Sequence, residues 1–145
     1  MRLLKFAGYG LVNMQFSIST KKKIELIDIT GQIEYAVERS GAKTGLCTVY
    51  APHATAAIII NEFEPNIQKD FEKVFETMLP HADYMHDHID NNAPAHLLSG
   101  LIGCGRTIPI EGGKLALGTW QKIIFCEFDG PRSLRNIVVT IITSP

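Results

Sequence analysis

The sequence of 145 residues has few cysteines and no excess of charge of either sign. Cys47, Cys104 and Cys126 are odd in number and form no C-x-x-C pair, which indicates reduced thiols and a cytoplasmic protein. The net charge of −1 lacks the basic field that attracts nucleic acid or an anionic membrane, so neither is expected as a partner. No apolar run approaches the roughly 20 residues of a membrane span, and no signal peptide is recognisable. Small molecules and other protein chains remain as partners.

The length fits one domain, residues 1–145, which can bury a core without disulfides or a structural metal. Any bound metal would therefore serve function. Hydrophobic periodicity predicts an α+β fold, an antiparallel-rich sheet or sandwich of about eight strands with about three helices on one side. Helices are expected from 28 or 30 to 41, from 64 to 79 and from 94 to 103. Strands are expected over 11–20, 24–29, 45–50, 56–60, on both sides of the turn at 111–113, over 122–128 and over 136–143.

Two pairs of strands carry specific expectations. Apolar and polar residues alternate over 11–20, so this strand should bury one face and form a hairpin with 24–29. Pro109 lies in the first strand of the second hairpin, and a proline inside a strand predicts a sheet edge or a bulge. The third helix should bury Leu97, Leu98, Leu101 and Ile102.

The segment 56–60 is apolar on both sides, so it should be covered on both faces and lie in the middle of the structure. His53 and Thr55 come just before this strand. Asn61 and Glu62 come just after it. The sequence therefore places polar side chains at both ends of a buried strand.

The densest group of candidate functional residues is Y-M-H-D-H-I-D-N-N-A-P-A-H, residues 84–96, which holds three of the five histidines. In an extended segment His86 and His88 would point to one side, where Asp87 or Asp90 could hold their ring nitrogens. Such a pair is a plausible set of metal ligands, although H-x-H in a polar loop is also typical of a solvated surface segment.

A helix is expected to start directly after this group, with Asn91 or Asn92 as its cap and Pro94 in its first turn. His96 would then lie at the positive end of the helix, which favours the neutral imidazole. The free amides of that turn could hold an anion such as phosphate.

Five motifs in order give a resemblance to a known family. They are P-H-A-T-A-A-I-I-I-N-E at 52–62, Y-M-H-D-H at 84–88, A-P-A-H-L at 93–97, G-T-W-Q at 118–121 and F-C-E-F-D-G-P-R at 125–132. Together they resemble the YjbQ family, also called the secondary thiamine-phosphate synthase enzyme family. The resemblance implies a compact α+β fold, commonly a homotrimer, with a cavity near the subunit interface that sometimes holds a metal ion or an anion. Lys122 departs from the usual small residue after G-T-W-Q, and would add a cation at the rim or face solvent.

The resemblance also implies which residues form the site. A divalent ion, zinc or magnesium, would be bound by His53, His86 and His96. Proton transfer would use His53, Glu62, Asp87 and His96. A small-molecule substrate, which could be phosphorylated, would contact Thr55, Asn61, Asn92, Thr119, Trp120, Gln121, Glu127 and Arg132.

Two of these residues have a second interpretation from the sequence alone. A single tryptophan such as Trp120 usually packs in the core, whereas the resemblance makes it a wall for a pyrimidine-like ring. Glu127 lies on an apolar strand and needs a partner, for which Arg132 or a metal ion is the nearest candidate.

Three functions stay open at this point. The first is a transferase with weak thiamine-phosphate synthase activity. The second is a metal-dependent hydrolase of a small phosphorylated substrate, with Glu62 or Asp87 as its base. The third is a non-catalytic trimeric protein that binds a metal or another ligand.

Overall fold

The computed structural model describes residues 2–6 and 9–143, with the side chains described from residue 9 onward. The strands are β1 (Arg2–Phe6), β2 (Tyr9–Thr20), β3 (Glu25–Asp28), β4 (Gly45–Tyr50), β5 (Ala56–Asn61), β6 (Gly105–Glu111), β7 (Lys114–Leu115), β8 (Lys122–Glu127) and β9 (Arg132–Thr143). The helices are α1 (Thr30–Ser40), α2 (Pro65–Thr77) and α3 (Ala93–Ile102), with a 3-10 turn η1 (Met85–His88). The predicted α+β class and the three helices are confirmed, whereas β1 was not predicted.

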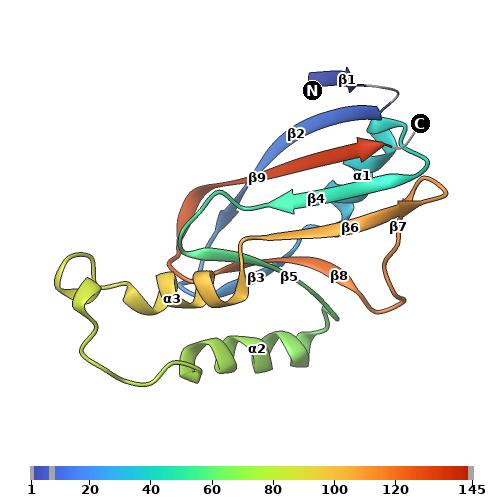
Figure 1. Ribbon diagram of the computed structural model, residues 1–145. Helices are drawn as coiled ribbons and strands as arrows, with labels where there is room; N and C mark the ends of the chain where they lie inside the picture. Colours follow the sequence, from blue (N-terminus) through green and yellow to red (C-terminus); the bar gives the residue numbers. More distant parts are fainter. Residues whose placement is uncertain (1, 7–8, 144–145) are drawn as a thin grey trace.

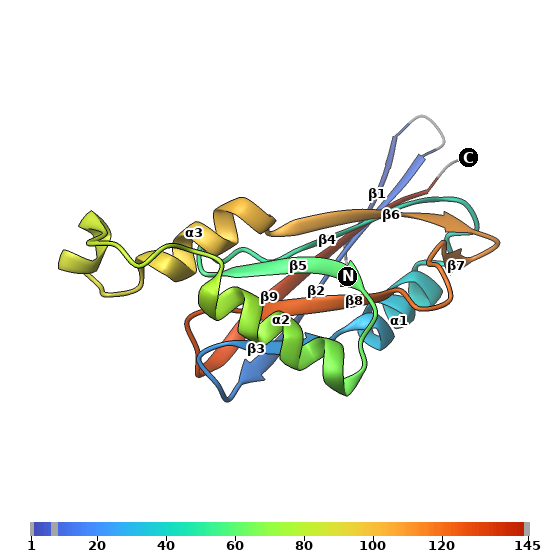
Figure 2. The same ribbon diagram turned by 90° about the horizontal axis from the view of Figure 1, so that it is seen from below.

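The strands form two antiparallel sheets, one of six strands in the order β1-β2-β9-β4-β6-β7 and one of three strands in the order β3-β8-β5. The smaller sheet lies between the larger sheet and the helices α2 and α3 (Figure 1). Seen from below, α1 lies beside the small sheet, at the opposite end of the molecule from α3. The η1 segment extends beyond α3 (Figure 2). The fold therefore has three layers, with the small sheet in the middle.

The middle layer is apolar on both faces because it contributes to two cores. Ile123 and Phe125 of β8 pack into the core under the large sheet, whereas Ile124 and Cys126 pack into the core under α2 and α3. Ala56–Ile58 of β5 are fully buried as well. The prediction that the segment 56–60 is covered on both faces is confirmed for these residues.

The predicted hairpin between 11–20 and 24–29 is wrong. β2 pairs with β9 over almost its whole length in the large sheet, whereas β3 pairs with β8 in the small one. Lys21 to Ile24 connect the two layers. Period-2 alternation identifies the buried face of a strand, but it does not identify the neighbouring strand.

The helix boundaries are close to the predicted ones, and their buried faces differ in detail. Helix α1 ends at Gly41, whose φ of 71° is the left-handed conformation expected at a helix end. Helix α2 begins where the Glu64 carboxylate accepts a hydrogen bond from the Ile67 amide. Helix α3 buries Leu98, but Leu97 and Leu101 are exposed, so that part of the predicted core face is wrong.

The second hairpin is confirmed. Gly112 and Gly113 have positive φ angles in the turn between β6 and β7. Pro109 lies opposite Leu46 of β4. On the other side of β6, the register with β7 covers only Ile110 and Glu111, so Pro109 lies at a sheet edge, as predicted.

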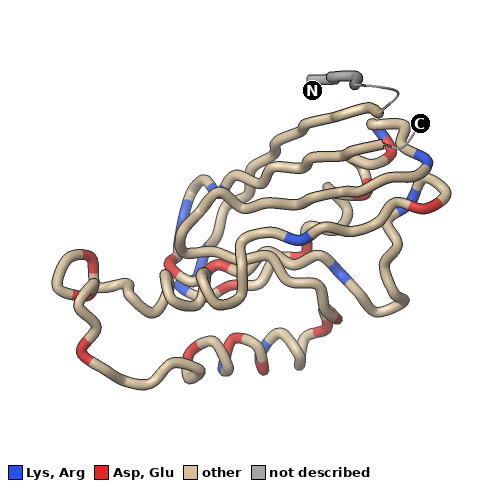
Figure 3. Tube along the Cα trace, in the orientation of Figure 1, with Lys and Arg blue, Asp and Glu red and all other residues tan. Residues whose placement is uncertain are grey.

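In the part of the chain that the structure describes, no helix is both long and apolar enough to cross a membrane. Lysines and arginines are scattered over the chain among acidic residues (Figure 3).

Candidate functional site

Antiparallel pairing of β5 with β8 sorts the motif residues into two groups. Ala56 lies opposite Glu127, and Asn61 lies opposite Lys122. The segment before β5 therefore meets the segment after β8, and the segment after β5 meets the G-T-W-Q loop before β8. Six residues of β8 span roughly 16 Å, so the two groups lie at opposite ends of the small sheet.

We name these groups by their residues. The histidine end comprises residues 51–55, 84–96 and 127–136. The tryptophan end comprises residues 61–62 and 118–122. Of the thirteen residues that the sequence predicted for one site, eight lie at the histidine end and five at the tryptophan end.

His53 and His96 line one pocket of about 560 Å³ at the histidine end, together with Tyr50, Ser99 and Cys104. His96 lies in the first turn of α3, as predicted. Cys104 was not predicted as part of a site, because the three cysteines are well separated and form no C-x-x-C pair. The pocket thus combines two imidazoles from distant parts of the chain with a thiol.

The main chain of β9 holds the His53 ring. Its Nε2 lies 2.8 Å from the amide nitrogen of Asn136 and 3.1 Å from the carbonyl oxygen of the same residue. The neutral ring accepts from the amide, whereas a protonated ring would donate to the carbonyl. Burial lowers the pKa of His53 and the charge of Arg135 lowers it further, against the opposing effects of the Asn136 carbonyl and of Glu127.

His86 and His96 are in contact. Their ring centroids lie 4.6 Å apart in an edge-to-face arrangement. The Nε2 atom of His86 is buried and has no hydrogen-bond partner among the described residues, with the Asp90 carboxylate 4.0 Å away. The unpaired nitrogen is the kind of atom that a ligand or a partner would satisfy.

The predicted pairing of His86 with His88 is wrong. Residues 85–88 form a 3-10 turn rather than an extended segment, so side chains two apart do not share a side. The exposed His88 pairs with Asp83 at 2.8 Å. Only His86 of the H-x-H motif faces the helix.

The three histidines do not form a metal site within one chain. Within residues 2–6 and 9–143, no group of three or more His, Cys, Asp or Glu side chains is arranged to hold a metal ion. The Nε2 of His53 is already engaged by Asn136. Within the described part of one chain, the ligands that the resemblance implies for zinc or magnesium are therefore an incomplete set.

The start of α3 is built differently from the prediction. Asn92 is the cap residue, but its side chain makes no capping hydrogen bond. The Asp87 carboxylate instead accepts from the Ala93 amide at 2.8 Å, which makes Asp87 a helix cap. The Asn92 side chain donates to the Asp129 carboxylate, which also pairs with Arg132. Asn92 and Arg132, which the sequence predicted to share a substrate, are thus joined through Asp129.

Glu127 is fully buried, and its partner is Arg135 rather than the predicted Arg132. Arg135 donates to both carboxylate oxygens, at 2.7 and 2.5 Å, and also to the hydroxyl of Thr55 at 3.0 Å. Thr20 and the amides of Phe128 and Asp129 complete the shell of Glu127. Glu127 and Thr55 therefore hold the strand ends together instead of facing a substrate.

The physical balance at Glu127 keeps it ionised. Burial by itself would raise its pKa, but the hydrogen bonds and charge of Arg135, the Asp129 amide and the Thr20 hydroxyl together lower the pKa below its ordinary value. Arg135 was missed because the last strand was expected to begin at residue 136. Its alternation with buried Ile137 and Val139 was the signal that could have found it.

The tryptophan end is open to solvent. Trp120 is 72% exposed, so the interpretation of this residue as core is wrong, and its role as a wall for a ring stays a prediction. Asn61 and Glu62 are exposed, and the Asn61 side chain accepts from the Glu62 amide. The Gln121 side chain accepts from the Gly118 amide at 2.8 Å and closes the loop that carries Thr119 and Trp120.

The fold and its polar ends define a class, a small α+β protein with motif residues at both ends of an internal three-stranded sheet. A family model described as UPF0047 protein YjbQ-like matches residues 14–144, and the chain belongs to this family. A UPF0047 protein of Archaeoglobus fulgidus is 48% identical over 126 residues, covering 86% of this chain and 98% of the relative. The UPF0047 protein YugU of Bacillus subtilis is 41% identical over 117 residues, with 80% and 89% covered.

Solved structures agree with this assignment. The fold is similar to that of a YbjQ-like protein of unknown function from Sulfolobus solfataricus, with a TM-score of 0.89, 42% identity, and 94% of this chain and 99% of that chain covered. A YjbQ/UPF0047 family protein from Clostridium acetobutylicum has a TM-score of 0.83 at 41% identity, with 88% and 98% covered. The family resemblance is confirmed. Membership establishes the fold and assigns no activity.

Proposed function

We propose that this protein is a small-molecule enzyme that works as a homotrimer, with each active site formed by the histidine end of one subunit and the tryptophan end of its neighbour. The observation that supports the proposal is the separation of the motif residues along β5 and β8. Residues that would serve one substrate lie roughly 16 Å or more apart within a chain. A second chain can bring them together.

The two ends also differ in a way that suits a closed ring. Two dissimilar surfaces that fit each other produce a head-to-tail contact, which closes into a cyclic oligomer when the rotation allows it. Large apolar side chains are exposed at both ends, Met85 and Ile89 at 78% and 77% and Trp120 at 72%. Exposed apolar groups of this size commonly mark contact surfaces.

The reaction class that we propose is the transfer made by thiamine-phosphate synthase. A thiazole phosphate nitrogen attacks a pyrimidine methylene carbon, and the bond from that carbon to the diphosphate oxygen breaks, so that the diphosphate leaves with the electron pair. The start of α3 and Arg132 would bind the diphosphate. Trp120 of the partner subunit would stack on the pyrimidine, where its ring also stabilises the developing positive charge. His96 or His53 would donate a proton to the departing diphosphate oxygen.

A mixing experiment tests where the site lies. The variants His96→Ala and Trp120→Ala each remove one half of it, so each should lose activity when assayed alone for thiamine phosphate formation. Trimers assembled from an equal mixture would contain intact sites at about a quarter of their interfaces, if subunits associate at random in a head-to-tail ring. A return of roughly that fraction of wild-type activity supports the shared site, whereas no return places both halves in one chain.

Two further measurements separate the parts of the proposal. Light scattering should give three times the chain mass, and a stable monomer at micromolar concentration would exclude the shared site. Arg132→Ala should slow turnover roughly 10²-fold if Arg132 binds the leaving group in the transition state. Equal rates for Arg132→Ala, His96→Ala and wild type would mean that the activity arises elsewhere.

A further inference from the structure

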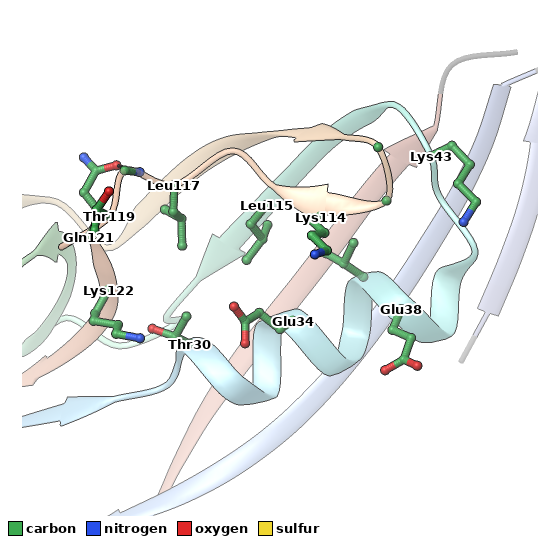
Figure 4. Close-up of a pocket in the computed structure, with 14 residues that line it drawn as sticks. Thr30, Glu34, Glu38, Lys43, Lys114, Leu115, Leu117, Thr119, Gln121 and Lys122 are labelled. Atoms are coloured by element: carbon green, nitrogen blue, oxygen red, sulfur yellow. Dashed lines mark hydrogen bonds between the residues drawn. The ribbon is translucent and has the colours of Figure 1, made fainter.

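A cavity that contains no histidine lies apart from the histidine end. It has a volume of about 740 Å³ and lies between α1, the β6–β7 hairpin and the loop that leads to β8 (Figure 4). We call it the lysine groove, because Lys43, Lys114 and Lys122 line it. Its lining comes from one chain and includes Thr119, Gln121 and Lys122 of the tryptophan end.

The charges in the lysine groove are of both signs and are not paired. The opposite wall carries Glu34 and Glu38, one turn apart on α1. In the part of the chain that the structure describes, no ion pair joins these two carboxylates to the three lysines. Opposite charges that face one cavity and remain apart can each bind a group of a ligand between them.

The backbone keeps the lysines on separate segments. Lys43 precedes β4, and its side chain lies against the hairpin turn, with Cδ and Nζ 3.5 Å from where a Cβ on Gly113 would be. Its carbonyl accepts from the Gly113 amide at 2.9 Å. Lys114 belongs to β7 and points toward α1, whereas Lys122 begins β8 and points toward the start of that helix (Figure 4).

Neutral groups complete the lining. The Gln121 oxygen is used by the Gly118 amide, which leaves the Gln121 amide nitrogen to donate to a ligand. The hydroxyl of Thr119 lies on the same rim. Leu115 and Leu117 give the groove an apolar floor with Val37. Polar donors around an apolar floor are typical of small-molecule sites.

We propose that the lysine groove binds a small phosphate monoester that also carries a protonated amine, with the phosphate toward the lysines and the amine toward Glu34 and Glu38. A phosphate without the amine would face two uncompensated carboxylates. An amine without the phosphate would face three uncompensated ammonium groups. The zwitterion matches both walls, and its carbon chain lies over the apolar floor.

The test uses the full chain and O-phosphoethanolamine as the probe, with inorganic phosphate and ethanolamine as separate comparisons. Calorimetry should give saturable binding of the zwitterion at least about tenfold tighter than binding of either comparison, because each charge-assisted contact contributes a factor of this order. Amide chemical shifts should change at Glu34, Gly113 and Gln121. No saturable binding, or shift changes confined to another surface, would overturn the proposal.

Two double variants test the two walls. Lys114→Gln with Lys122→Gln should weaken binding of the zwitterion by about tenfold or more, whereas Lys73→Gln, an exposed lysine of α2 outside the groove, should not. Glu34→Gln with Glu38→Gln should abolish the preference for the zwitterion over inorganic phosphate. If inorganic phosphate binds wild type as tightly as the zwitterion, the groove is a simple anion site and the proposal is wrong. Retained melting temperatures show that the variants are folded.

Discussion

The buried pair of Glu127 and Arg135 allows a quantitative prediction of stability. Glu127 has no exposed surface, and the side chain of Arg135 is only 9% exposed, so neither group can exchange its partner for water. We expect Glu127→Gln to leave the Arg135 charge buried without a carboxylate. The variant keeps the volume of the side chain, removes the charge and turns one acceptor oxygen into an NH2 group that faces donors.

The expected cost follows from this geometry. Removing one partner of a buried ion pair typically costs about 3 to 5 kcal/mol. A domain of this size has a total stability of about 5 to 15 kcal/mol, so the loss is a large fraction of it. At about 2 to 4 °C per kcal/mol, the melting temperature should fall by roughly 6 to 20 °C.

The comparison variant is Arg132→Ala, at the start of β9, the strand that also carries Arg135. Arg132 also pairs with a carboxylate, that of Asp129, but the Arg132 side chain is 48% exposed. Exposed pairs contribute about 1 kcal/mol or less. Thermal and urea unfolding should therefore separate the two variants by several degrees, with Glu127→Gln the less stable. Equal effects would refute the reasoning that burial decides the contribution of these pairs.

Three other predictions follow from single groups. Burial raises the pKa of Cys47 and of Cys126 to about 12, so a thiol reagent at pH 8 should modify Cys104 alone in the folded protein and all three thiols in denaturant. The pKa of His53 is lowered, so the contribution of the neutral ring to stability is complete above the ordinary pKa of 6.5 and is lost as the pH falls through the lowered pKa. The free energy of urea unfolding should therefore depend less steeply on pH in His53→Gln than in wild type. An equally steep dependence in both proteins would contradict this. Gly45→Ala should be strongly destabilised, because its Cβ would lie 2.0 Å from the Ile142 carbonyl oxygen, whereas Gly31→Ala on α1 has free space and should gain about 0.5 kcal/mol in the same unfolding assay.

Local patterns in the sequence identified the elements and the two-sided burial of the middle layer. The apolar run at 56–60 predicted a strand covered on both faces, and residues 122–128 predicted a strand with two opposed sets of side chains, because a side chain's face is fixed by its position along a strand. The glycines at 41, 112 and 113 marked a helix end and a turn, since positive φ favours glycine. These features depend on residues that are close together in the chain, so they can be predicted without knowledge of the fold.

The tertiary structure decided which strands pair and which polar groups meet. Several strands have similar patterns of apolar and polar residues, so the sequence does not show which of them is the neighbour of β2. The pairing of β2 with β9 rather than β3 depends on the whole sheet. The partner of Glu127 lies eight residues away and became visible only when β9 was seen to start at Arg132. The motifs predicted one site, but the antiparallel register of β5 and β8 places its residues at two opposite ends of the small sheet, because antiparallel strands bring the start of one beside the end of the other.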